Sequence, residues 1–87
     1  MTRYFFHSED GHPFRDREGV ELADLAAAER EAVLALGEMI RDHADELIGR
    51  RPFRIIVTDR QQVVLFSVVA KLEDPPRGGE VLTEPPA

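Results

Sequence analysis

The chain has 87 residues, 43% of them hydrophobic and 32% charged, which is ordinary for one small globular domain with a modest core. It contains no cysteine, so disulfides, zinc–thiolate sites and thiol chemistry are excluded. We expect a cytoplasmic protein without membrane contact, because the chain has neither an apolar run of roughly 18 residues nor a basic-then-apolar signal segment. The net charge of -6 disfavours nucleic acid as a partner, and the densest basic group is Arg50, Arg51 and Arg54.

The N-terminal residues predict a strand, a loop and a short returning strand. Residues 3–7 are an aromatic run with strong strand preference. Residues 8–19 combine Asp10-Gly11, Pro13 and Gly19 with charged side chains, as is typical of a connecting loop. Residues 20–22 alternate apolar and polar, so we expect them to pair with the first strand.

One long helix is predicted over residues 25–48. Asp24 is suited to cap its first turn, and Gly49 and Pro52 are suited to end it. The apolar positions recur at spacings of three and four over about six turns. They are Leu25, Ala28, Ala32, Leu36, Met39, Ile40, His43 and Leu47. Because His43 belongs to this stripe, we interpret it as a histidine at the edge of the core.

Residues 53–58 and 63–70 predict an antiparallel hairpin, joined by the polar residues 59–62. A tight turn centred on residues 60 and 61 pairs residue 57 with 64, 55 with 66 and 53 with 68. In that register six apolar side chains share the face that we expect beneath the helix. They are Phe53, Ile55, Val57, Val64, Phe66 and Val68.

Together these elements predict an α+β fold. A three- or four-stranded antiparallel sheet in ββαββ order carries the one long helix packed on one face. The helix is about 36 Å long at 1.5 Å per residue, and a ten-residue strand is about 33 Å long, so the helix can cover the hairpin. We expect the domain to occupy residues 1–72, followed by a disordered tail rich in Pro and Gly over residues 73–87.

Residues 63–70 are apolar on both alternating sets, and such a strand needs cover on both faces. Since the helix covers one face, we expect a homodimer, in which a second copy covers the other face or pairs with a sheet edge. The predicted interaction surface is Arg54, Ile56, Val63, Leu65, Ser67 and Val69. The first strand adds either Phe5 and His7 or Tyr4 and Phe6.

No catalytic or cofactor motif is found, so we predict a non-enzymatic interaction or regulatory module. The alternative is a small-ligand or metal-binding protein that uses residues 7–18. Five possible metal ligands or acid–base groups lie in that segment, although their spacing matches no common metal motif. They are His7, Asp10, His12, Asp16 and Glu18.

The order of motifs along the chain is also informative. An opening Arg3-Tyr4-Phe5-Phe6-His7 precedes Asp10-Gly11, an Ala-rich helix and the strand Ile55-Ile56-Val57-Thr58-Asp59. In this order the motifs resemble a family of short bacterial proteins catalogued as a domain of unknown function, over residues 2–72. The resemblance implies a standalone domain and brings no activity or catalytic residues. The Gly-x-Glu-Leu-x-Asp segment at 19–24 is also similar to HicB-type antitoxin domains, which implies a partner protein as a further alternative.

Overall fold

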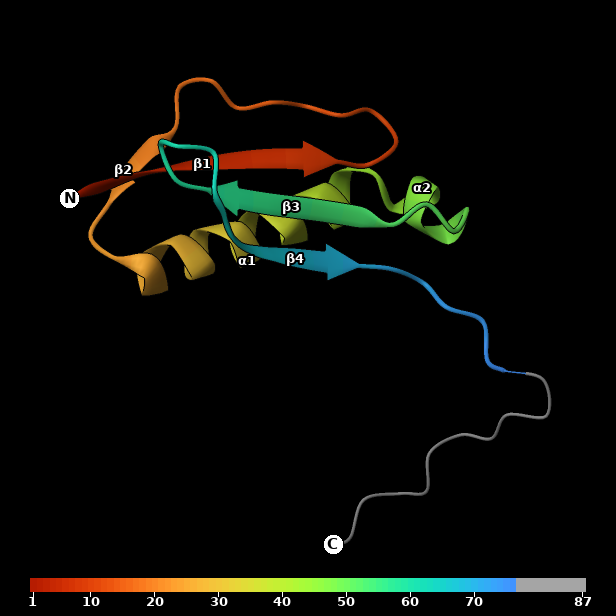
Figure 1. Cartoon of the computed structure of the whole chain (residues 1–87). Helices are drawn as coiled ribbons and strands as arrows, with labels where there is room; N and C mark the ends of the chain where they lie inside the picture. The colour runs from red at the N-terminus through yellow and green to blue at the C-terminus, as the bar shows by residue number, and fades with distance from the viewer. Residues whose placement is uncertain (77–87) are drawn as a thin grey trace, which may run out of the picture.

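The computed structural model describes residues 1–76 and shows a four-stranded antiparallel sheet with helices on one face (Figure 1). Its elements are β1 (Thr2–Glu9), β2 (Val20–Leu22), α1 (Leu25–Asp42), α2 (Ala44–Ile48), β3 (Phe53–Thr58) and β4 (Val64–Ala70). The strand order is β2-β1-β3-β4, so β2 and β4 form the two edges. The predicted α+β fold and its ββαββ order are confirmed. The predicted tail falls mainly on residues 77–87, which lie outside the described residues.

Helix α1 begins where the sequence predicts. The Asp24 carboxylate accepts a hydrogen bond from the Ala27 amide at 2.9 Å, which satisfies one of the free donors of the first turn. Ala28 and Ala32 are fully buried and Leu36 nearly so. The two alanines allow α1 to approach the sheet closely, because they place only a methyl group between the backbones. None of the described helices is long and apolar enough to cross a membrane.

The prediction of one continuous helix to residue 48 is wrong at its last turns. The backbone leaves the helical conformation at His43, with φ -132° and ψ 39°, and α2 follows as a separate turn. The 18 residues of α1 span about 27 Å, which already exceeds the roughly 20 Å of a six-residue strand. The break lets Leu47 pack against the core, and His43 is exposed rather than at the core edge.

The predicted hairpin register is also wrong, by two residues. Val57 pairs with Phe66 and Ile55 with Val68, and the register shifts between Val57 and Thr58. Asp59 explains the difference, since its carboxylate accepts from the amides of residues 61 and 63 and so lengthens the turn. A two-residue shift keeps the alternation of faces, so the rest of the predicted helix side stands. Val64, however, is 60% exposed, and Ala70 takes its place against the core.

Strand β1 resolves the alternative that the sequence leaves open. Tyr4 is buried and Phe6 packs against the core, so these two side chains face α1. Phe5 and His7 therefore lie on the opposite side, which we call the open face of the sheet. The core itself consists of Tyr4, Ala28, Ala32, Leu36, Phe53, Ile55 and Val57.

Candidate functional site on the open face

His7 is held in one orientation on the open face by two hydrogen bonds. Its Nδ1 accepts from the backbone amide of Asp16 at 3.1 Å, so the ring proton of the neutral imidazole is on Nε2. That nitrogen lies 3.0 Å from Oγ1 of Thr58, to which it donates. Thr58 is only 5% exposed, and this bond gives its hydroxyl the partner that a buried polar group requires. His7 thus ties the loop after β1 to strand β3.

Asp16 organises that loop through its carboxylate. Oδ2 accepts from the amide of Phe6 at 3.0 Å, and Oδ1 accepts from the amides of Glu18 and Gly19 at 3.1 and 3.0 Å. Burial raises the pKa of Asp16, but the three amide donors together with the nearby His7 outweigh it and bring the pKa below its usual value. The carboxylate therefore stays ionised and acts as a structural acceptor.

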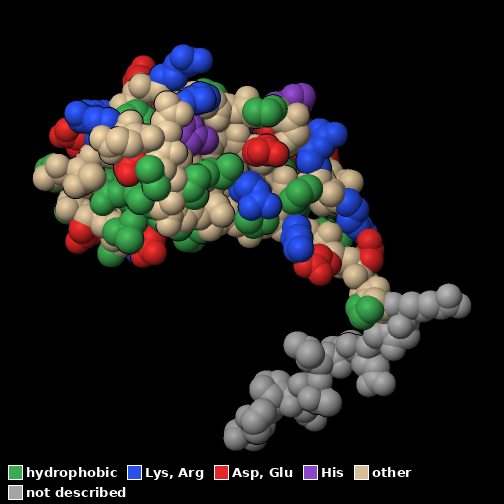
Figure 2. All heavy atoms as spheres, in the orientation of Figure 1, with side chains coloured by type: hydrophobic (Ala, Val, Ile, Leu, Met, Phe, Trp, Pro, Cys, Tyr) green, Lys and Arg blue, Asp and Glu red, His purple; other side chains and the backbone are tan. Residues whose placement is uncertain are grey.

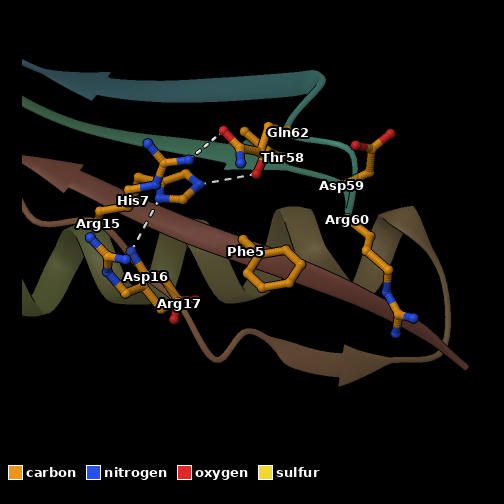
Figure 3. A pocket seen from close by; sticks show the side chains of 9 residues that line it. All are labelled: Phe5, His7, Arg15, Asp16, Arg17, Thr58, Asp59, Arg60 and Gln62. Carbon is orange, nitrogen blue, oxygen red and sulfur yellow. Dashed lines mark hydrogen bonds between the residues drawn. The ribbon is translucent and has the colours of Figure 1, made fainter.

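A hollow of about 210 Å³ lies beside these residues on the open face (Figure 3). The Phe5 ring lies in its middle, with His7 and Arg15 toward one end and Arg60 at the other. Arg15 donates to the side-chain oxygen of Gln62, and Arg17 also lines the hollow. We call this group the arginine hollow: Phe5, His7, Arg15, Asp16, Arg17, Thr58, Asp59, Arg60 and Gln62.

The predicted interaction surface lies partly on the open face and partly along the edge strand β4. Ile56 is half-buried there, and Leu65 and Val69 are 40% and 42% exposed. Val63 is 55% exposed in the turn before β4. In the same orientation as Figure 1, hydrophobic side chains form a patch near the region where β4 begins (Figure 2).

The possible metal ligands of residues 7–18 do not converge. Among residues 1–76, no three His, Asp or Glu side chains come together as a metal ion would require. Both ring nitrogens of His7 have protein partners. Asp10 accepts from the amide of His12 at 3.2 Å and so closes the Asp-Gly turn.

Residues 3–71 match the model of one protein family, described as a domain of unknown function, DUF6894. The chain belongs to this family. The match runs from within β1 to just after β4, so the DUF6894 domain comprises the sheet, both helices and the arginine hollow. Searches of curated proteins and of solved structures found no match.

Sequence reasoning did not find the basic group of this DUF6894 domain. Of the predicted group, Arg50 pairs with Asp74 at 2.6 Å instead of adding to a basic surface. The arginines that share a hollow come from the loop after β1 and from the β3–β4 turn, 43 or more residues apart. The Arg15-Asp16-Arg17 triplet is a local signal, but only the fold brings Arg60 to it.

Proposed function

We propose that this domain is a non-enzymatic interaction module that self-associates through strand β4. The observation that carries the proposal is the unshielded edge of the sheet. β4 is the outer strand, and its seven residues, VLFSVVA, include no proline and no charge. Natural edge strands usually carry such features to prevent pairing with another chain. Their absence here, with Val64 and Val69 exposed, favours a second strand beside β4.

The β4 sequence is complementary to itself in antiparallel pairing. With the two-fold axis at Ser67, Leu65 lies opposite the partner's Val69 on the open face. On the helix side, Phe66 lies opposite the partner's Val68. Each cross-strand pair is apolar, and the only residue that meets its own copy is the small Ser67. A closed two-fold dimer of this kind forms one sheet of eight strands and leaves no free β4 edge.

Helix α1 extends the same apolar edge. Glu38 lines a hollow with Phe14 and Ser8, so its flank of α1 faces the β1 side of the sheet. Val33 lies five residues earlier, about 140° around the helix, on the other side of the buried stripe. This places Val33, which is 57% exposed, on the β4 side. Two copies paired through β4 would bring these flanks toward each other and bury the exposed valines.

A charge swap at Ser67 tests the proposal. Ser67→Glu and Ser67→Lys each place like charges opposite one another at the axis, so each variant alone should be monomeric. An equimolar mixture should form dimers again, because Glu then faces Lys. Sedimentation velocity over micromolar to millimolar concentrations measures this. Ala23→Glu, an exposed position directly after β2, adds the same charge at the opposite edge of the sheet and should leave the wild-type dimer intact.

Two results would refute the β4 dimer. One is a wild-type chain that stays monomeric over the whole concentration range. The other is a Glu–Lys mixture that stays monomeric as each variant does alone. If the two-fold axis is at Ser67, the introduced glutamate of one chain must face the introduced lysine of the other, so the mixture has to dimerise. Circular dichroism of each variant controls for folding, and the exposed position of Ser67 predicts no loss of structure.

A further inference from the structure

The arginine hollow has features that self-association through β4 does not use. It lies at β1 and the turn after β3, and Phe5 contributes an aromatic ring from the open face (Figure 3). Three arginines line it in a chain whose net charge is -6. The carboxylates of Asp16 and Asp59 also line it, which leaves an excess of one positive charge among these five side chains.

Most of the other polar groups in the hollow are already used by the protein. The carboxylates of Asp16 and Asp59 accept backbone amides, and His7 directs its Nε2 proton at Thr58. By contrast, Arg17 and Arg60 have no hydrogen-bond or ion-pair partner among residues 1–76. The donors available to a ligand are therefore guanidinium groups, which suit the oxygens of a phosphate.

Gln62 holds one of the three arginines through a side-chain hydrogen bond. It has a positive φ of 66° in the loop of the β3–β4 turn, where its amide donates to the carbonyl oxygen of Asp59 at 3.0 Å. In this position its side-chain oxygen accepts from Arg15, which keeps that guanidinium at the rim of the hollow. The β3–β4 turn is thus shaped so that one arginine is fixed, while Arg17 and Arg60 can turn toward a ligand.

We propose that the arginine hollow binds a small phosphate monoester that carries a flat ring. The ring packs on Phe5, and the phosphate is bound by Arg15 and Arg17, at the end of the hollow away from Arg60 (Figure 3). A dianionic phosphate has three oxygens to distribute among several guanidinium groups, whereas a carboxylate has two and a single charge. The volume of about 210 Å³ limits the buried part to a ring or a phosphate group, with the remainder of the ligand in solvent.

Phenyl phosphate is the probe for this proposal. Titrated into the ¹⁵N-labelled full chain, it should shift the backbone amide signals of Phe5, Asp16 and Gln62 in a saturable way. Benzoate should bind at least several-fold more weakly, inorganic phosphate should bind more weakly because it lacks the ring, and benzylamine should not bind. The Ser67 variants should bind phenyl phosphate as the wild type does, so failure of the dimer and failure of this site are distinguishable.

Charge-removing variants locate the binding. Arg17→Gln should weaken the binding of phenyl phosphate by about tenfold, since it removes a charge-assisted hydrogen bond, and Arg60→Gln should weaken it less. Arg54→Gln is the matched control: this exposed arginine of β3 does not line the hollow, and the variant should bind normally. Thermal melting should be the same for all three variants, because none of these side chains has an ion-pair partner among residues 1–76.

Three results would overturn the proposal. The first is the absence of saturable shifts with phenyl phosphate at tens of millimolar. The second is binding of benzoate or benzylamine as tight as that of phenyl phosphate, which would show that the hollow does not select for a phosphate group. The third is an equal loss of affinity in Arg54→Gln, which would show a diffuse response to surface charge instead of a site.

Discussion

The two faces of the sheet use the same strands and contain similar side chains, yet they differ sharply in burial. On the side of α1, Phe53 and Val57 are 0% exposed. On the open face, Leu65 and Val69 are 40% and 42% exposed, although they too are large aliphatic residues. The difference lies in the helix, which removes one face from water and leaves the other available for contacts. Side-chain hydrophobicity alone does not decide which face becomes the core.

The helical layer and the sheet also differ in charge. The helical segment 24–48 carries seven acidic and two basic residues, whereas the strand segments 1–23 and 49–76 together carry eight acidic and eight basic residues. The net charge of -6 therefore describes the helical layer better than the sheet. A basic hollow on an acidic protein is compatible with electrostatics because screening confines surface fields to about 8 Å at physiological salt.

The largest expected difference between the faces concerns their apolar side chains. Phe53→Ala should lower the free energy of unfolding by about 3–5 kcal/mol, because it leaves a cavity beneath α1. Leu65→Ala should cost less than about 1.5 kcal/mol, since Leu65 already keeps 40% of its surface in water. Urea unfolding of dilute protein measures both. Equal losses would contradict the assignment of the core to the helix side alone.

Glycine-to-alanine substitutions should have opposite effects on stability in the loop after β1 and in helix α1. Gly19 has φ +74°, and an added Cβ would lie 2.9 Å from the carbonyl oxygen of Tyr4, so Gly19→Ala should destabilise by about 1–3 kcal/mol. Gly37→Ala should have the opposite sign, with a gain of up to about 1 kcal/mol, because Gly37 is mid-helix with open space around it. Thermal and urea unfolding test the two signs, and a loss at both positions would contradict this difference.

The last expected effect on stability depends on pH. Asp16→Asn replaces an acceptor oxygen by an amide group, which should cost about 1–2 kcal/mol at neutral pH. The folded-state pKa of Asp16 is lowered, so its contribution is complete above the ordinary carboxyl pKa of about 3.9 and is lost as the pH falls through the folded value. The difference between wild type and variant should therefore narrow below about pH 4. Glu31→Gln, on the exposed side of α1, serves as the control.

A constant difference between wild type and Asp16→Asn from neutral to acidic pH would contradict the role of the ionised carboxylate. If Asp16→Asn loses stability while the His7 signals in NMR spectra stay unchanged, the hydrogen bonds of the Asp16 carboxylate and the His7–Thr58 hydrogen bond contribute independently.

Local patterns in the sequence were sufficient for much of the fold. Spacings of three and four residues predicted α1, Asp24 predicted its start, and β-branched runs predicted β3 and β4. The local patterns gave the wrong prediction where two hairpin registers fit the same alternation of apolar and polar residues. A two-residue shift of the hairpin preserves which residues face the helix, so alternation could not distinguish the predicted register from the observed one. The end of α1 at Asp42 has no glycine or proline signal, so no local pattern marks it.

The sequence by itself determined the types and order of the elements, because hydrophobic periodicity and capping act over a few neighbouring residues. Tertiary structure alone decided that Asp16 caps the amide of Phe6 and that His7 reaches Thr58, 51 residues away. It also decided that Arg60 joins Arg15 and Arg17 around Phe5. The physical reason is that such sites depend on strand pairing between distant segments, and no short-range pattern encodes which loops that pairing brings together.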